Sequence, residues 1–240
     1  MTIFVLTLSP SGSHPMCCTS IVIVTLLGAS VLFAQDAKTV GVTTEEINDG
    51  FVSLFDGKTL QGWQGDVQHY AVKDGVMVCH GVNLFTMKEY ANFILRFDFK
   101  LPPGGNNGVG IRSPLKGEPT FNGMKIQILD DGHEMYKGWL KPWQVHGSIY
   151  GVVAAKRGFL KPIGQWNQEE ILADGPHIKV TLNGTVITDA DLSKIERSID
   201  DHDHPGLHNA KGYISWLGHT TSPNPPDPVE FRNIRIKELP

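Results

Sequence analysis

The segment Gly123-Met124-Lys125-Ile126-Gln127-Ile128-Leu129-Asp130-Asp131 alternates apolar and polar side chains in the way a β-strand does. Successive side chains of a strand point to opposite faces of a sheet. Met124, Ile126 and Ile128 would then face a core, while Lys125 and Gln127 would face away from it. The strand runs directly into two adjacent carboxylates. This pattern predicts a polar ligand lying on one face of a sheet.

The preceding segment, Asn106–Arg112, supports the same prediction. Gly108, Gly110 and Arg112 share one face of the expected strand, and the apolar residues between them take the other. Glycine inside a strand often marks the close approach of a ligand or another backbone, although a bulge beside a solvated arginine is the alternative. We therefore predict that four polar side chains line one cavity: Arg112, Lys125, Gln127 and Asp130.

Short runs with strand character follow one another along the chain, separated by turn signals. Asp74-Gly75 and Asn183-Gly184 each lie between two such runs and predict tight hairpins, because both residue types tolerate positive φ. Met87–Asn92 and Leu192–Arg197 are the candidates for single helical turns. Further strands are expected at 93–100, 108–113, 123–129, 148–153, 168–173, 212–217 and 229–238. About a dozen short strands without a long amphipathic helix predict an all-β sandwich.

Several stretches resemble the 3-keto-disaccharide hydrolase family, also described as 3-keto-glucoside 1,2-lyases and 3-keto-2-hydroxy-glucal hydratases. They occur in the family's order across nearly all of residues 50 to 240. The resemblance implies a jelly-roll β-sandwich similar to concanavalin-A-like lectins and glucanases, a topology that strand pattern alone does not distinguish. The matching stretches are Phe51–Trp63, Leu101–Gly108, Gly123–Asp131, Leu140–Gln144, Gly147–Gly151, Gly164–Asn167, His204–Gly206 and Phe231–Leu239.

The first residues are typical of a targeting segment. Ile21–Phe33 is an apolar run too short for a comfortable membrane span, and Ala34 could end a cleavage site. We expect a signal peptide over 1–34, a polar linker over 35–49 and one domain over 50–240. The protein would then be periplasmic or secreted, without stable membrane insertion after cleavage. The alternative is an uncleaved membrane anchor.

Charge and cysteine content exclude several classes of function. The formal net charge of −4 and the lack of a basic stripe argue against nucleic-acid binding. Cys17 and Cys18 lie in the expected signal peptide, so Cys79 alone would remain in the mature chain and no internal disulfide could form. We expect the Cys79 thiol to be buried or half-buried. No glycine-rich dinucleotide motif follows an expected strand, so no redox cofactor is expected.

The usual glucanase mechanism needs two carboxylates facing the same bond. On this strand the corresponding positions hold Lys125 and Gln127, so that pair is missing. Members of the resembled family often carry Glu where this chain has Lys125. The resemblance therefore does not imply that position 125 acts here as an acid catalyst or as the ligand of a divalent cation.

The resemblance implies a 3-keto sugar as the substrate, and this changes what the site must supply. The ketone acidifies the hydrogen on C2, so a base can remove it and expel the group on C1. That reaction needs a base, a donor for the enolate oxygen and an acid for the leaving group. Asp130 could be the base, or the ligand of an activating divalent cation, and Arg112 could stabilise the enolate. The candidate acids are His146, Tyr150 and His219.

Each candidate also has a structural alternative. Asp130 could simply open a turn, and Tyr150 could be a core aromatic with a satisfied hydroxyl. Trp143 could stack on a sugar ring or cap the sandwich. His204 is a candidate substrate-binding residue because it lies in the His-Pro-Gly segment. The surrounding cluster His202-Asp203-His204, with His208 nearby, has residue types that bind metals, but its spacing matches no established zinc pattern.

The sequence therefore predicts an exported, single-domain enzyme that cleaves 3-keto-glucosides or 3-keto-disaccharides, by elimination and hydration or by hydrolysis. Its substrate would be an oligosaccharide or glucoside whose keto group comes from a separate sugar 3-oxidoreductase. The alternative is a non-catalytic carbohydrate-binding module of the same fold that uses Trp143, Arg112 and Gln127.

Overall fold

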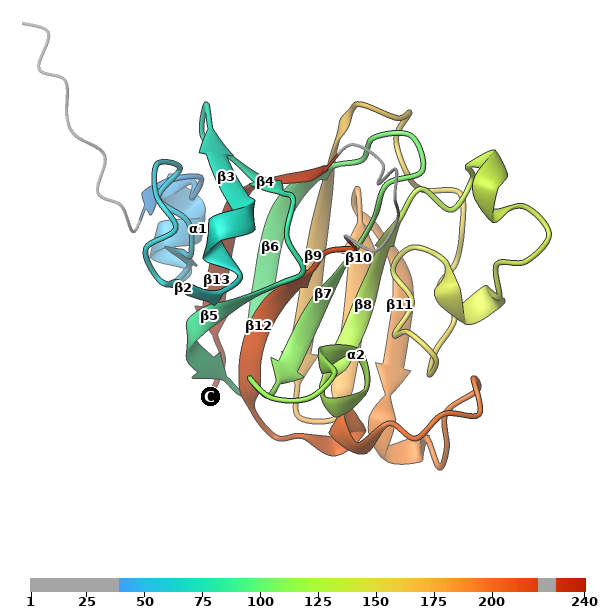
Figure 1. Cartoon of the computed structure of the whole chain (residues 1–240). Helices are drawn as coiled ribbons and strands as arrows, with labels where there is room; N and C mark the ends of the chain where they lie inside the picture. The colour runs from blue at the N-terminus through green and yellow to red at the C-terminus, as the bar shows by residue number, and fades with distance from the viewer. Residues whose placement is uncertain (1–38, 220–227) are drawn as a thin grey trace, which may run out of the picture. The chain divides into compact units, whose positions relative to one another are not determined.

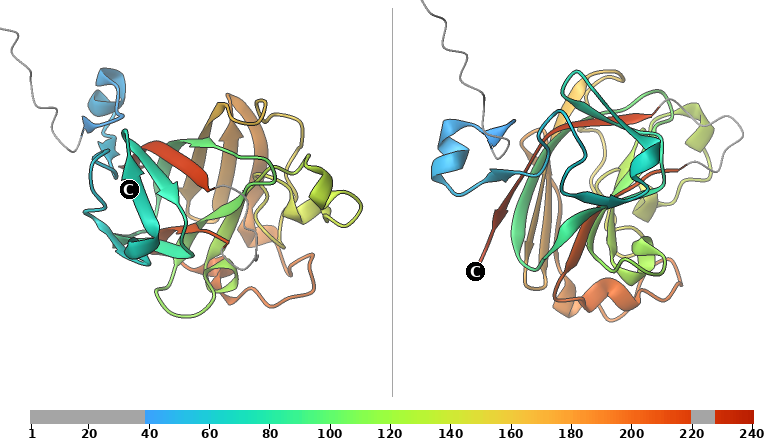
Figure 2. Two further views of the ribbon diagram at one scale, coloured as in Figure 1. Left: turned by 45° about the horizontal axis from the view of Figure 1, so that its top comes forward. Right: turned by 60° about the vertical axis from the view of Figure 1, so that its left-hand side comes forward.

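Two antiparallel β-sheets form the part of the protein that the computed structural model describes, residues 39–219 and 228–240 (Figure 1). The described residues all belong to one compact unit, Gln35–Pro240. The expected signal peptide over 1–34 lies outside them. Figure 2 shows the two sheets as separate layers that face each other. The predicted all-β sandwich is confirmed. No helix within the described ranges is long and apolar enough to cross a membrane.

The smaller sheet contains the alternating segment Met124–Leu129. Its five strands run in the order β2-β5-β12-β7-β8, and every neighbouring pair is antiparallel. Strand β8 lies at one edge and pairs with β7 from Ile111 opposite Met124 to Asn106 opposite Leu129. The strands are β2 (Trp63–Gly65), β5 (Asn83–Tyr90), β7 (Asn106–Ser113), β8 (Met124–Leu129) and β12 (Gly212–Leu217).

The larger sheet forms the opposite layer. Its strands run in the order β11-β10-β9-β6-β13-β4-β3, and β1 also pairs with β13. The strands are β1 (Val52–Ser53), β3 (Tyr70–Lys73), β4 (Val76–Cys79), β6 (Phe93–Lys100), β9 (Trp166–Asp174), β10 (His177–Leu182), β11 (Thr185–Asp191) and β13 (Val229–Glu238). Hairpin β3–β4 turns at Asp74-Gly75 and hairpin β10–β11 at Asn183-Gly184, all four residues having positive φ, as predicted.

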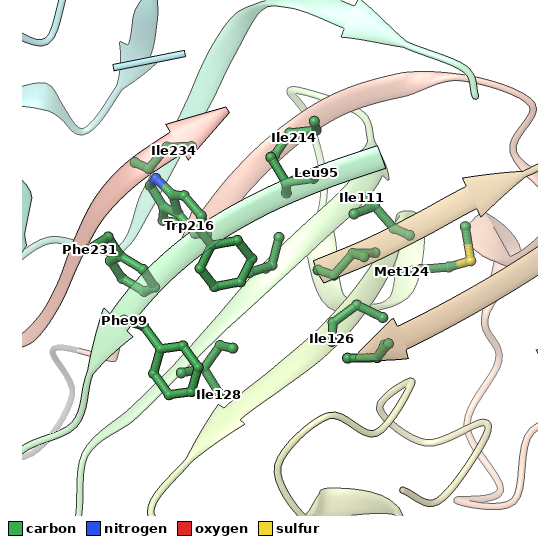
Figure 3. Close-up of a cluster of buried hydrophobic side chains, with 14 of the residues drawn as sticks. Leu95, Phe99, Ile111, Met124, Ile126, Ile128, Ile214, Trp216, Phe231 and Ile234 are labelled. Atoms are coloured by element: carbon green, nitrogen blue, oxygen red, sulfur yellow. The ribbon is translucent and has the colours of Figure 1, made fainter. Parts of the chain in front are cut away.

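The hydrophobic core fills the space between the sheets (Figure 3). Trp216 of β12 lies at its centre and stacks on Phe231 of the opposite sheet, with ring centroids 4.3 Å apart. Phe97 contacts both rings edge to face. Such aromatic pairs add about 0.5–1.5 kcal/mol each to the effect of burial. The apolar residues of β8 also point into this core, so its alternation was predicted correctly and its polar residues face outward.

Helices are short and few in the described residues. They comprise α1 (Thr44–Asn48), α2 (Pro119–Asn122) and 3₁₀ turns at Val67–His69, Glu134–Tyr136, Pro142–Gln144, Leu192–Lys194 and Pro205–His208. The helical turn predicted within Leu192–Arg197 is present. The one predicted at Met87–Asn92 is not, because residues up to Tyr90 continue β5. The strand predicted at 148–153 is reduced to isolated bridges from Ile149 to Ile126 and Val153.

Helix α1 lies within the segment 35–49 that the sequence suggested as a linker. Thr43 and Glu46 make a reciprocal capping box at the start of the helix. The Glu46 carboxylate then bridges Arg96 of β6 and Arg235 of β13, at 3.0 and 2.8 Å. These ion pairs join α1 to the larger sheet. Polar composition suggested a linker, but the polar side chains are used for docking.

Candidate functional site

Lys125 projects from β8 onto the face of the smaller sheet that points away from the core. Its side chain is only 4% exposed, because it lies flat across the neighbouring strand over Gly108. A Cβ atom built on Gly108 would lie 2.3 Å from Cε of Lys125, so only glycine leaves room for this arrangement. Gly108 therefore marks a close approach, but the group that it accommodates is the side chain of Lys125, whereas Gly110 accommodates the hydroxyls of Ser215 and Ser113.

The nitrogen of Lys125 lies 3.1 Å from Nε2 of His219, just beyond the end of β12. It also lies 5.1 Å from the centre of the Tyr150 ring. Burial lowers the pKa of Lys125 to about 8, although the charge of Glu118 opposes this. Desolvation of the ring nitrogens, together with the charge of Lys125, lowers the pKa of His219 to about 4, although the residue as a whole is exposed at the surface. At pH 7 the histidine is therefore uncharged, and most of the lysine is protonated with about a tenth present as the neutral amine.

Tyr150 is held over this pair by the segment that borders β8. Its backbone N–H donates to the carbonyl of Lys125 at 2.8 Å, and this hydrogen bond joins the Tyr150 segment to the edge strand β8. Its hydroxyl accepts a 3.0 Å hydrogen bond from Nε2 of Gln144. The ring meets Trp143 edge to face, with centroids 5.1 Å apart. Sequence and packing thus bring Lys125, Tyr150, Trp143 and His219 together, as expected for one site.

More polar atoms line the same face next to Lys125. The Gln127 amide nitrogen donates to Oδ1 of Asn106 at 3.4 Å. Within the described residues, its Oε1 atom and the hydroxyls of Ser113 and Ser215 are buried without a hydrogen-bond partner. Buried polar atoms are nearly always paired, so these three retain capacity to bind a polar molecule. We call Asn106, Lys125, Gln127, Tyr150 and His219 the Lys125 cluster.

His204 is paired with Asp200 beside the Lys125 cluster. Both oxygens of the Asp200 carboxylate lie 3.1 Å from Nε2 of His204, and both side chains are buried. The pair packs against Gly151, the residue after Tyr150, where an added Cβ would lie 2.7 Å from the same Nε2. Phe121 of α2 contacts the His204 ring edge to face. His204 therefore borders the site, with its ring held in place by Asp200.

Arg112 does not lie in the cavity predicted for it. It follows the last residue of β7 that pairs with β8 and has a φ of +50°, at a bulge in the pairing of β7 with β12. This turns the guanidinium toward loops at one end of the sandwich. It donates to the carbonyls of Ala91, Gly175 and Asn209 and to Oδ1 of Asn92. Arg112 therefore holds three loops together, and the predicted enolate-binding placement is wrong.

Asp130 also lies away from the Lys125 cluster. It follows β8 five residues after Lys125, about 16 Å along an extended strand. Its carboxylate accepts a 2.9 Å hydrogen bond from the backbone N–H of Gly104. The neighbouring Asp131 accepts from the backbone of His146 and pairs with Arg157. Both carboxylates thus organise loops, which is the structural alternative for Asp130 that the sequence left open.

His146 points into the core rather than onto the polar face. Its ring stacks on Phe99, and its Nδ1 accepts a hydrogen bond from the backbone of Leu129. Its Nε2 lies 2.9 Å from Oε2 of Glu169, a carboxylate 2% exposed. Glu169 was not among the residues predicted for the site. The signal was available, because Glu169 alternates with Ile171 and Ala173 on the core face of β9.

Residues 39–219 and 228–240 do not form a divalent-cation site. The described residues contain no group of three or more His, Cys, Asp or Glu side chains placed to hold a metal ion. The Lys125 cluster itself offers an ammonium group and no carboxylate, and hard divalent cations prefer carboxylate oxygens. The His202-Asp203-His204 segment uses His204 to bind Asp200 instead. No step of the chemistry below is therefore assigned to a metal.

A polar sheet face with aromatic side chains and unpaired polar atoms is suited to binding a polar ligand such as a sugar. Comparison with known families defines the class of protein. Residues 50–237 match the 3-keto-alpha-glucoside-1,2-lyase-like domain, so the chain belongs to that family, and the resemblance seen in the sequence is confirmed.

Similar proteins agree with this assignment. A 3-keto-disaccharide hydrolase of Bacteroides thetaiotaomicron is 26% identical over 235 residues, covering 80% of this chain and 79% of the relative. Two crystal structures of candidate glycosyl hydrolases from Parabacteroides distasonis are also similar. One is 32% identical with a TM-score of 0.69, covering 79% of this chain and 99% of that one. The other is 26% identical with the same TM-score, covering 82% and 98%. These comparisons support a carbohydrate-active function for this protein.

Proposed function

We propose that this protein cleaves 3-keto-α-glucosides by elimination at the Lys125 cluster. The observation that carries the proposal is a buried lysine beside an uncharged histidine on the polar sheet face. Elimination from a 3-keto sugar needs three groups: one that activates the C3 ketone, a base for the C2 hydrogen and an acid for the oxygen that leaves C1. Three adjacent side chains offer these functions in a family of lyase-like domains.

Lys125 would contact the keto group, since its nitrogen is the strongest electrostatic feature of the cluster. Binding of the sugar ring would use the polar atoms beside it, above all Gln127 and Asn106. The apolar stem of Lys125 and the rings of Tyr150 and Trp143 would exclude water, which strengthens polar interactions with the developing charge.

His219 is the proposed base. Its ring is neutral at pH 7, and its Nε2 points toward Lys125 and therefore toward the same part of the substrate. A pKa of about 4 makes it a weak base before the reaction begins. Negative charge that develops on the substrate offsets the charge of Lys125, which is one cause of the lowered pKa. The basicity of His219 would therefore increase as the C2 hydrogen leaves.

Tyr150 is the proposed acid for the leaving group. Its hydroxyl is oriented by Gln144, and its ring lies over the Lys125 nitrogen. Elimination would give a 3-keto-2-hydroxy-glucal and the free alcohol or sugar. Addition of water across the new double bond would then complete a net hydrolysis. Asp130, Arg112 and His146 have no part in this scheme, because each is engaged elsewhere in the fold.

The same proposal includes the protein's place in the cell and in a reaction sequence. The apolar run before Ala34 supports export to the periplasm or medium by a cleaved signal peptide. The 3-keto group must be made first, so a sugar 3-oxidoreductase would supply the substrate. Intact-mass measurement on exported protein tests the first part, because retention of residues 1–34 would contradict it.

The experiment compares 3-keto-trehalose with unoxidised trehalose, each with and without a chelator. Purified wild-type protein should release a 3-keto product from the oxidised sugar alone, and the chelator should have no effect. Binding of either sugar without release would support the carbohydrate-binding module instead. Cleavage of unoxidised trehalose would show that the keto group has no role and would overturn the proposal.

A further inference from the structure

Lys125 has an environment unlike that of the other lysines in the described residues. It is the only lysine among their buried side chains. Within the same residues, no carboxylate oxygen lies within 4.0 Å of its nitrogen, whereas six other lysines form ion pairs: Lys88, Lys100, Lys137, Lys194, Lys211 and Lys237. The titratable groups that face it are His219, Tyr150 and Glu118. Desolvation without a partner anion favours the neutral amine, which is the nucleophilic form of lysine.

We propose that Lys125 forms a covalent Schiff base with the C3 ketone of the substrate. This inference deepens the proposed function and rests on it. The geometry that supports it is the approach of the Lys125 nitrogen to an uncharged ring nitrogen, on a face where glycine leaves the side chain free to lie across the sheet. An amine held beside a neutral proton acceptor can lose its proton and attack a carbonyl carbon.

The chemical balance of this step is complete without any further reagent. The Lys125 amine adds to C3, and the resulting carbinolamine loses water to give an iminium ion. Removal of the C2 hydrogen by His219 gives an enamine, which expels the C1 oxygen as an alcohol protonated by Tyr150. The product is then a conjugated iminium ion. Water hydrolyses it, releasing the 3-keto-2-hydroxy-glucal and restoring the Lys125 amine. The water lost at the start is thereby returned, together with the one proton that the carbinolamine took from solvent to expel it. Exchange with solvent removes the C2 proton from His219 and returns a proton to Tyr150, which restores the site.

Covalent attachment gives the buried Lys125 a role in activating the C2 hydrogen that hydrogen bonding alone would not provide. An iminium ion withdraws electrons from C2 more strongly than a neutral ketone does. The C2 hydrogen then becomes acidic enough for a weak base such as His219. If Lys125 only donated a hydrogen bond to the ketone, the C2 hydrogen would be less acidic and His219 would be a poor base for its removal.

Reductive trapping tests the proposal directly on the full-length protein. Wild-type protein is incubated with 3-keto-trehalose and cyanoborohydride, digested and examined by mass spectrometry. The expected result is a reduced sugar adduct on the peptide containing Lys125. Lys125→Arg keeps the positive charge but removes the nucleophile, so it should give no adduct and lose at least about a hundredfold in turnover. Lys73→Arg, on the opposite sheet, is the matched control and should behave as wild type.

Turnover measured without the reductant distinguishes failure of the covalent step from failure of the proposed elimination activity. A wild type that cleaves the keto sugar but gives no adduct, with an active Lys125→Arg variant, overturns the covalent step alone. A wild type without turnover overturns the proposed function and this inference with it. The pH profile gives a second readout. Because the neutral amine is the reactive form, kcat/KM should rise through a pKa of about 8. A fall above that pH would indicate a non-covalent ammonium and contradict the proposal.

Discussion

Replacing Gly108 with alanine perturbs the site without removing any of its chemical groups. Gly108 has an ordinary backbone conformation within β7, so alanine causes no strain there. The added Cβ would lie 2.3, 2.8 and 3.0 Å from the Cε, Cγ and Cδ atoms of Lys125. Ordinary contacts begin near 3.4 Å. Cε must therefore move by about 1.1 Å or more, the difference between 3.4 and 2.3 Å, and the Lys125 nitrogen must move with it.

The expected effect falls on turnover rather than on folding. A displacement of about 1 Å in a reacting group can cost on the order of a hundredfold in rate. Alanine in a strand interior gains roughly 0.5–1 kcal/mol over glycine through backbone entropy, and the displaced lysine offsets some of that gain. We therefore expect Gly108→Ala to lower kcat/KM for a 3-keto-glucoside about a hundredfold, with a melting temperature within a few degrees of wild type.

The assay pairs initial rates on the keto sugar with a thermal melt. Gly132→Ala is the matched control, because its added Cβ meets nothing closer than 3.9 Å and its φ is not positive. That variant should keep both rate and stability. Wild-type turnover by a folded Gly108→Ala variant would refute the reasoning, since it would show that the position of Lys125 does not govern the reaction.

Other variants test the corrected roles of residues outside the cluster. Arg112→Met should lower the unfolding free energy by about 2–4 kcal/mol, because carbonyls of three loops lose their donor; unchanged stability in a urea melt would contradict this. Asp130→Asn should cost about 1 kcal/mol of stability and leave turnover unchanged, so a large loss of rate would return Asp130 to the site. Burial raises the pKa of Glu46, but bonds from Thr43, Arg235 and Arg96 outweigh this and lower it. Its stabilising contribution is therefore present above the ordinary value of 4.5 and lost as the pH falls through the lowered pKa. Thermal melts of Glu46→Gln should lack that part of the acid dependence, and melts that follow wild type would refute the role.

Alternation along β8 predicted much of the fold and the central part of the site. It placed Lys125 and Gln127 on the outer face because a strand with a buried side tolerates no slip in register. The hairpins at Asp74-Gly75 and Asn183-Gly184 followed from local turn chemistry. These features depend on neighbours in sequence, which is why sequence reasoning reached them.

Features that depend on the backbone leaving its regular path were missed. Arg112 was placed by extending the alternation of β7, but its positive φ and the adjacent bulge redirect the side chain. His146 appeared to be a free loop histidine, yet it meets Glu169 from a strand of the other sheet. Contacts between distant segments such as these arise from packing, and no local pattern around His146 encodes them.

Cleavage of a 3-keto-glucoside at the Lys125 cluster requires that the C2 hydrogen be lost before the C1 oxygen departs. The most direct measurement follows deuterium placed at C2 of 3-keto-trehalose during turnover in ordinary water. Incubation without protein measures spontaneous exchange next to the ketone. Elimination predicts that the deuterium passes to solvent, so the released 3-keto sugar lacks it while recovered substrate retains it. A released sugar that keeps its C2 deuterium would show direct hydrolysis of the glycosidic bond and contradict the account.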